Sequence, residues 1–67
     1  MPTRIVFLEK DLDLAVAEEL EDVRTKIELQ ARSGRLLSLE RATPAREMVC
    51  INPSAVAYLE TIEGDAG

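Results

Sequence analysis

The chain opens with an apolar pattern that is typical of β-strands. The segment Arg4 to Leu8 is rich in β-branched and aromatic residues, which predicts a strand. Glu9 to Asp11 form a charged turn, and from Leu12 to Val16 apolar residues alternate with small or polar ones, the period of a half-buried strand. We therefore expect a β-hairpin over the first 16 residues.

An alternative interpretation starts a long helix at this turn, with Asp11 as its N-cap. On such a helix Leu14 would lie opposite Val16 and Leu20, so the apolar residues would not share one face. The hairpin explains the alternation better.

From about Ala17 the spacing changes to intervals of three and four residues, which predicts an amphipathic helix. Its buried face would comprise Val16, Leu20, Val23, Ile27 and Ala31. Acids at the start and bases later suit the helix macrodipole, and Asp22 with Lys26 and Glu28 with Arg32 have the spacing of favourable ion pairs. Gly34 would end the helix as a left-handed C′ residue.

The second half predicts a second hairpin and a final strand. Arg35 to Arg41 and Arg46 to Ile51 read as strands, separated at Ala42 to Ala45 by a turn that contains Pro44. Asn52-Pro53-Ser54 then breaks the pattern, and Pro53 favours a short helical turn through Val56. Ala57 to Ile62 would form the last strand.

These elements predict an α+β fold in the order ββαβββ, with an antiparallel sheet of four or five strands and one amphipathic helix packed on it. Residues 1–63 would form one domain and residues 64–67 a flexible tail. The expected core consists of Ile5, Phe7, Leu12, Leu14, Val16, Leu20, Val23, Ile27, Leu37, Leu39, Val49, Ile51, Val56 and Leu59.

Composition narrows the range of partners. The net charge is −5 and no basic run occurs, which disfavours direct binding to nucleic acid because phosphate contacts depend on clustered Lys and Arg. No apolar run approaches the roughly 20 residues of a spanning helix, so no membrane contact is expected. The single Cys50 suits a reducing cytoplasm, and its apolar neighbours predict a buried thiol.

The residue inventory offers little for catalysis. The chain has no His, which removes His-based triads and the usual zinc sites, and no Gly-rich phosphate loop occurs. The acids Glu18, Glu21 and Asp22 would share one side of the helix without loop carbonyls to complete a cation shell. We therefore expect a protein that is not an enzyme and carries no metal or cofactor.

The segment Val49 to Glu60 resembles the strand, Asn turn and returning strand of the small flagellum-associated FlbD family. Ile5 to Ile27 resembles that family's hairpin and acidic helix, although the two halves come here in the opposite order. The tight Asn-Gly turn common in that family is replaced by Glu9 to Asp11 and by Ala42 to Ala45. The resemblance implies a small, non-enzymatic accessory protein.

Size points to association. A chain of 67 residues buries only about 60% of its unfolded surface, and without disulfide or metal the remaining stabiliser is oligomerisation. We predict a self-associating bacterial or phage module that binds a further protein. The alternative is an acidic regulator, an antitoxin or nucleic-acid mimic, that binds a basic partner protein. Candidate partner contacts are Glu18, Glu21, Asp22, Leu29, Asn52, Pro53 and Tyr58.

Overall fold

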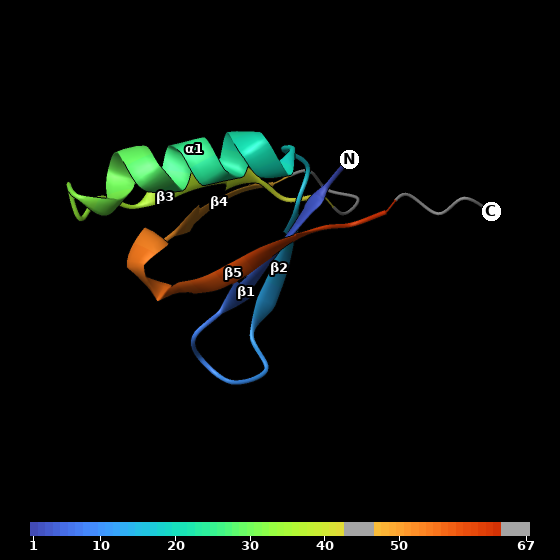
Figure 1. The fold of residues 1–67 in the computed structure, drawn as a ribbon, viewed down its shortest axis with the longest axis horizontal. Coiled ribbons are helices and arrows are strands. Elements are labelled where there is room, and N and C mark those ends of the chain that lie inside the picture. Colours follow the sequence, from blue (N-terminus) through green and yellow to red (C-terminus); the bar gives the residue numbers. More distant parts are fainter. Residues whose placement is uncertain (43–46, 64–67) are drawn as a thin grey trace.

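The computed structural model describes residues 1–42 and 47–63 and has the predicted α+β architecture (Figure 1). The elements in chain order are β1 (Thr3–Phe7), β2 (Asp13–Val16), α1 (Leu20–Ala31), β3 (Leu37–Glu40), β4 (Met48–Ile51), the 3₁₀ turn η1 (Pro53–Ala55) and β5 (Val56–Thr61). The hairpin prediction for the first two strands is confirmed. The turn residues 43–45, Arg46 and the tail 64–67 lie outside the described residues.

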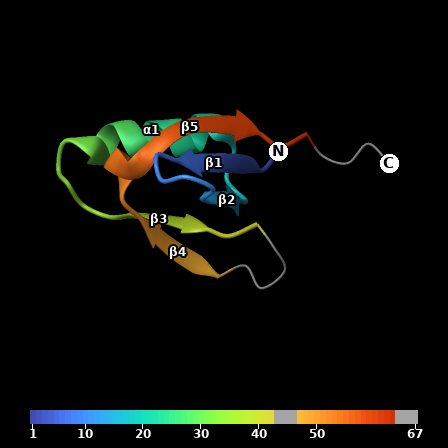
Figure 2. The ribbon, with the colours of Figure 1, turned by 90° about the horizontal axis from the view of Figure 1, so that it is seen from below.

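The strands form two antiparallel sheets in place of one continuous sheet. One has the order β2-β1-β5 and the other pairs β3 with β4. A single bridge between Val16 and Arg41 joins them, because Ala17 donates its N–H to the Glu40 carbonyl at 2.8 Å and Ala42 donates to Ala15 at 3.0 Å. The strands therefore follow one another as β5, β1, β2, β3 and β4, and Figure 2 shows β4 at the margin of this series.

The helix begins later than predicted, at Leu20. Ala17 is held extended by its bond to Glu40, and the carbonyl of Glu18 accepts a 2.8 Å bond from the hydroxyl of the buried Thr3. These two contacts hold the backbone out of the helical conformation until Glu19, whose carbonyl accepts from Val23. The helix ends near Gly34, whose φ of +69° confirms the left-handed conformation, although Gly34 lies two positions beyond the C-cap Arg32.

Twelve of the predicted core residues form the apolar core or pack against it. The buried set is Ile5, Val16, Val23, Leu37, Leu39 and Ile51, and the half-buried set is Phe7, Leu14, Ile27, Val49, Val56 and Leu59. Each sheet contributes the inward-facing side of its strands, and α1 adds Val23 and Ile27 from one helix face. The core thus lies between the two sheets and the helix.

Several predictions about single residues are wrong. Leu12 is 46% exposed because it lies in the turn of the first hairpin, one residue before Asp13, the first paired residue of β2. Leu20, in the first helical turn, is only half-buried, and Ala31, in the last, is exposed. Cys50 is exposed as well, since residues in a strand alternate between faces and its neighbour Ile51 takes the inner one.

Candidate interaction surfaces

Strand β4 presents an open hydrogen-bonding edge. Arg41 donates its N–H to the carbonyl of Glu47 at 2.8 Å, so these two residues form a hydrogen-bonded pair of the β3–β4 ladder. Hydrogen-bonded and non-hydrogen-bonded pairs alternate in an antiparallel ladder, and Val49 and Ile51 therefore bond to Leu39 and Leu37. The N–H and C=O groups of Met48 and Cys50 point away from β3.

The side chains at this edge are apolar and exposed. Met48 is 64% exposed, and Cys50 lies beside it on the same outer face. The Cys50 Sγ atom lies 3.6 Å from the Ser38 Oγ atom of β3. Charged side chains and prolines commonly protect exposed edges, but neither occurs from Met48 to Ile51.

The opposite edge strand, β5, is built differently. Its register against β1 steps from Val6 with Tyr58 to Phe7 with Val56, which leaves Ala57 as an extra bulged residue. Glu60 places a charge on this strand, and both β5 and η1 contact α1. A bulge and a charge are both devices that discourage edge pairing.

On the inner strand β3, a side chain bonds one backbone group that faces away from β4. The Glu40 N–H points away from β4 and is bonded by both carboxylate oxygens of Glu18, at 3.2 and 3.0 Å. Lys26 Nζ lies 3.7 Å from the same carboxylate, which replaces the predicted pairing of Lys26 with Asp22. Glu18 therefore takes the place of a strand neighbour, and its carboxylate is turned toward the fold.

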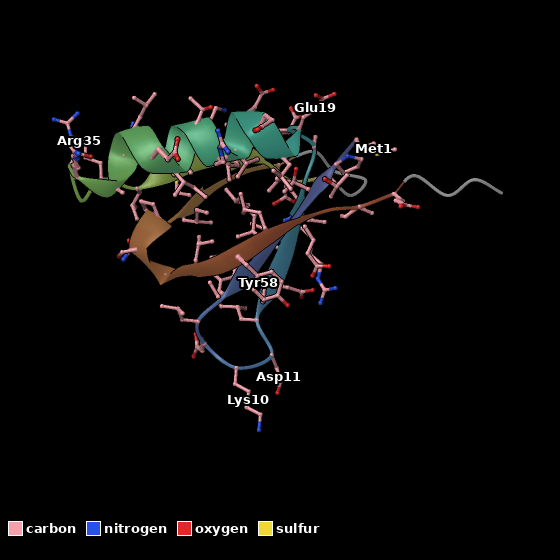
Figure 3. All side chains as sticks on the ribbon, in the orientation of Figure 1. Met1, Lys10, Asp11, Glu19, Arg35 and Tyr58 are labelled. Atoms are coloured by element: carbon pink, nitrogen blue, oxygen red, sulfur yellow. The ribbon has the colours of Figure 1, made fainter. Side chains whose placement is uncertain are left out.

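The remaining acids of the predicted contact set lie in the first turn of α1. Glu21 and Asp22 are exposed, and Glu21 lies 3.7 Å from Arg24, one turn along the helix. Glu19 lies 3.5 Å from the N-terminal amine of Met1, and Figure 3 shows these two residues side by side at the start of the helix. Glu19 and Glu21 thus each have a cationic neighbour within the chain.

Leu29, Asn52, Pro53 and Tyr58 lie in four different settings. Leu29 is 73% exposed on the outer side of α1, as its position off the apolar stripe predicted. Asn52 accepts bonds from the Ser54 N–H at 3.0 Å and from the Ser54 hydroxyl at 2.7 Å, which confirms the Asn turn. Pro53 is buried as the first residue of η1, so a partner would not reach its ring. Tyr58 is 53% exposed on β5.

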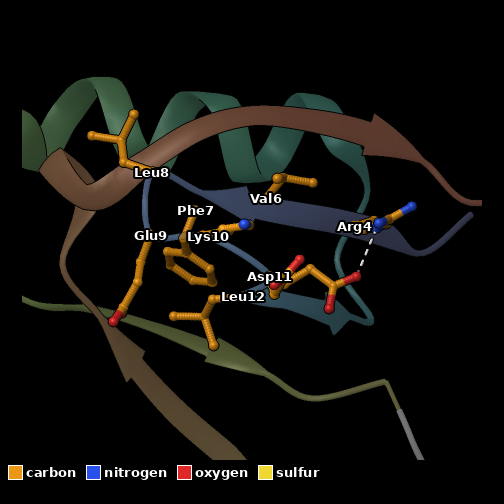
Figure 4. Close-up of a pocket in the computed structure, with 9 residues that line it drawn as sticks. Arg4, Val6, Phe7, Leu8, Glu9, Lys10, Asp11 and Leu12 are labelled. Carbon is orange, nitrogen blue, oxygen red and sulfur yellow. Dashed lines mark hydrogen bonds and ion pairs between the residues drawn. The ribbon is translucent and has the colours of Figure 1, made fainter.

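A hollow lies under the tip of the first hairpin and has a volume of about 400 Å³ (Figure 4). Its lining residues are Arg4, Val6, Phe7, Leu8, Glu9, Lys10, Asp11, Leu12 and Asp13. Arg4 is neutralised by Asp13 at 2.8 Å and faces Glu60 at 3.7 Å. Asp11 has a φ of +63°, which shapes the tight turn. Charges of both signs surround this hollow, so it favours no one ligand charge.

The residues that sequence reasoning missed are Met48 and Cys50. The signal for them was present, because placing Val49 and Ile51 in the core assigns the residues between them to the outer face of the same strand. The prediction of a buried Cys50 relied on its apolar neighbours and ignored that alternation. That β4 would be an edge strand, however, depends on strand order, which the local pattern does not encode.

Comparison with protein-family models, with curated proteins and with solved structures finds no match to this chain. The resemblance to the FlbD family therefore stays a prediction. Among the described residues, no helix has the length and apolar character needed to cross a bilayer, and no group of three or more His, Cys, Asp or Glu side chains comes together at metal-binding distances.

Proposed function

We propose that this chain is a small, non-enzymatic interaction module of the cytoplasm that associates with a second copy of itself through the edge of β4. The main support is that the backbone N–H and C=O groups of Met48 and Cys50, two of each, point outward from an uncharged strand. Extended segments add to such an edge by completing its ladder, a recurring mode of protein recognition. A further protein partner would then meet the assembled pair.

Energetics favours association of this kind. A chain of 67 residues leaves a large part of its apolar surface exposed, and here Met48, Leu8, Leu29 and Leu36 are each more than 60% exposed. Contact through β4 would cover Met48 and Cys50 and give partners to their outward backbone groups. Because the chain carries a net charge of −5, an uncharged segment is also where two copies meet with the least repulsion.

The acidic-regulator alternative draws less support from the geometry. It requires exposed carboxylates that are free to meet a basic groove, whereas Glu18 bonds the Glu40 backbone and Glu19 and Glu21 each have a cationic neighbour. Asp22 remains as the exposed acid of the predicted set that has no ion pair among the described residues.

The proposal is tested by light scattering from low micromolar to near-millimolar concentration. We expect the mass to rise to that of two chains and to change little with salt, because backbone pairing and apolar contact are screened far less than surface charges. Cys50→Lys should give a monomer at all concentrations, since an edge lysine opposes strand addition. The matched control is Ser38→Lys, which places the same charge on the same sheet face but one strand inward.

A wild-type chain that stays monomeric throughout would overturn the proposal. A dimer that survives in Cys50→Lys would move the contact surface away from β4. A dimer that dissociates steeply with added salt would indicate a charge-driven contact and would favour the acidic surface of α1.

A further inference from the structure

We infer that two copies join through a twofold axis beside Val49, with β4 antiparallel to its counterpart and Met48 directly opposite Cys50 of the second copy. This inference rests on the proposed self-association and specifies its register. Three observations support this register: the backbone groups that point outward from β4, the hydrogen bond already made by Asn52 and the side chains that would meet across the interface.

Hydrogen bonding restricts the register first. Only the even-numbered residues of β4, Met48 and Cys50, direct their backbone groups to the open edge. Hydrogen-bonded pairs across the interface must therefore join even-numbered residues with even-numbered residues. A register that places Met48 opposite Ile51 is excluded, because the N–H and C=O of Ile51 point to β3.

Of the registers beside Val49 and beside Cys50, the one beside Val49 uses the described edge more fully. It pairs Met48 with Cys50 of the second copy and Cys50 with Met48, so all four outward groups of each edge find partners. A register beside Cys50 would set Met48 against Asn52, but Asn52 lies past the end of β4 and its carbonyl already accepts from Ala55 at 2.9 Å. That register would leave the outward backbone groups of Met48 without a full set of hydrogen-bond partners.

The side chains agree with this choice. On the outer face, Met48 and Cys50 of one copy meet Cys50 and Met48 of the other, which buries four apolar, polarisable groups together. On the inner face the two Val49 side chains, each half-buried in the isolated chain, become direct neighbours and extend the core across the axis. Glu47 falls opposite Ile51, so no two carboxylates face each other. Such self-complementarity is what a twofold interface requires.

Cysteine cross-linking with oxidised glutathione tests the register. Oxidation removes two protons and two electrons from a pair of thiols and reduces the glutathione disulfide. Three proteins are compared: the native chain with Cys50 alone, Met48→Cys, which carries thiols at both positions, and Met48→Cys with Cys50→Ser. Directly opposed residues of a hydrogen-bonded pair have Cα atoms about 5.5 Å apart, which a disulfide spans, whereas diagonal neighbours at about 7–8 Å are too far apart.

We expect only the Met48→Cys protein to form a covalent dimer, seen on a non-reducing gel and reversed by reductant. Within one chain, the thiols at 48 and 50 lie about 6.6 Å apart along the strand, beyond the roughly 3.5–4.5 Å that bridged Cβ atoms require. Ready cross-linking of the native chain would instead indicate the register beside Cys50. Cross-linking of the Met48→Cys, Cys50→Ser protein would indicate the register beside Met48.

The outcomes separate the register from the association itself. The inferred register is wrong, while self-association stands, if the Met48→Cys protein is a dimer under reducing conditions but oxidation does not link it. The same conclusion follows if either single-thiol protein links readily. If the native chain and all variants remain monomeric under reducing conditions, the proposed function fails and the register with it.

Discussion

The two ends of the strand series differ in how they meet solvent. At β5 the edge is interrupted by the bulge at Ala57, carries Glu60 and lies against α1. At β4 the edge is straight over its described length, bears no charge from Met48 to Ile51 and shows Met48 at 64% exposure. Figure 2 shows the two strands at opposite sides of the series.

This difference indicates that the chain can protect an edge where protection is needed. The side of β3 that faces away from β4 supports the same conclusion, because the Glu18 carboxylate occupies the Glu40 N–H. The β5 edge is thus interrupted by a bulge and the Glu40 N–H of β3 is bonded by a carboxylate, whereas β4 has neither a bulge nor a charge from Met48 to Ile51. An unprotected edge is a pairing template, and this contrast is the reason for proposing β4 as the surface of self-association.

The largest expected effect comes from comparing two proline substitutions in β4, at Val49 and at Cys50. Val49→Pro removes an N–H that bonds Leu39 and replaces a half-buried side chain that packs against the core with a ring that cannot fit a central strand position, so it should lower the free energy of unfolding by on the order of 3 kcal/mol. Cys50→Pro removes an N–H that points outward and should leave the monomer close to wild type, while abolishing the dimer. Urea unfolding at low protein concentration measures the first effect and light scattering the second.

If Cys50→Pro destabilised the monomer as much as Val49→Pro, the Cys50 N–H would have a partner within the chain. The assignment of β4 as an open edge would then be wrong. Unfolding must be followed below the concentration at which chains associate, because dimerisation adds its own stability to the native state.

A smaller effect is expected at the protected side of β3. Glu18→Ala removes the acceptor of the partly buried Glu40 N–H and should lower the free energy of unfolding by about 1–3 kcal/mol. Glu18→Gln keeps an acceptor oxygen and should lose less. Glu21→Ala, in the exposed first turn of α1, serves as the control and should stay within about 0.5 kcal/mol of wild type. Equal stability of Glu18→Ala and Glu21→Ala would contradict a structural role for Glu18.

The smallest expected effect is at β5. Glu60→Val removes the charge from this edge but leaves the bulge at Ala57 and the contact with α1 in place, so the solution mass should stay that of two chains. Assemblies larger than a dimer, detected by light scattering, would show that Glu60 alone protects this edge. The contrast between the two edges would then depend on one charge rather than on backbone shape.

Local sequence patterns predicted most of the elements and most of the core. The alternation from Leu12 to Val16, the three-and-four spacing after Ala17 and the Asn52-Pro53 turn each report interactions between near neighbours in the chain, which is why all three were found. The errors at Leu12, Leu20 and Cys50 arose where exposure depends on which element lies alongside. The start of α1 was misplaced for the same reason, because Ala17 and Glu18 are held by Glu40 and Thr3.

Residue types and their spacing along the chain were enough to establish the order of the elements, most of the inward-facing residues of the strands and the helix, and the absence of His. These properties depend on residue type and on the periods of 2 and 3.6 that covalent geometry imposes. The folded chain was needed to show that the strands split into two bridged sheets, that Glu18 bonds the backbone of β3 and that β4 lies at an open edge. Those outcomes depend on pairing between residues far apart in the chain, because an edge is defined by the neighbour that a strand lacks.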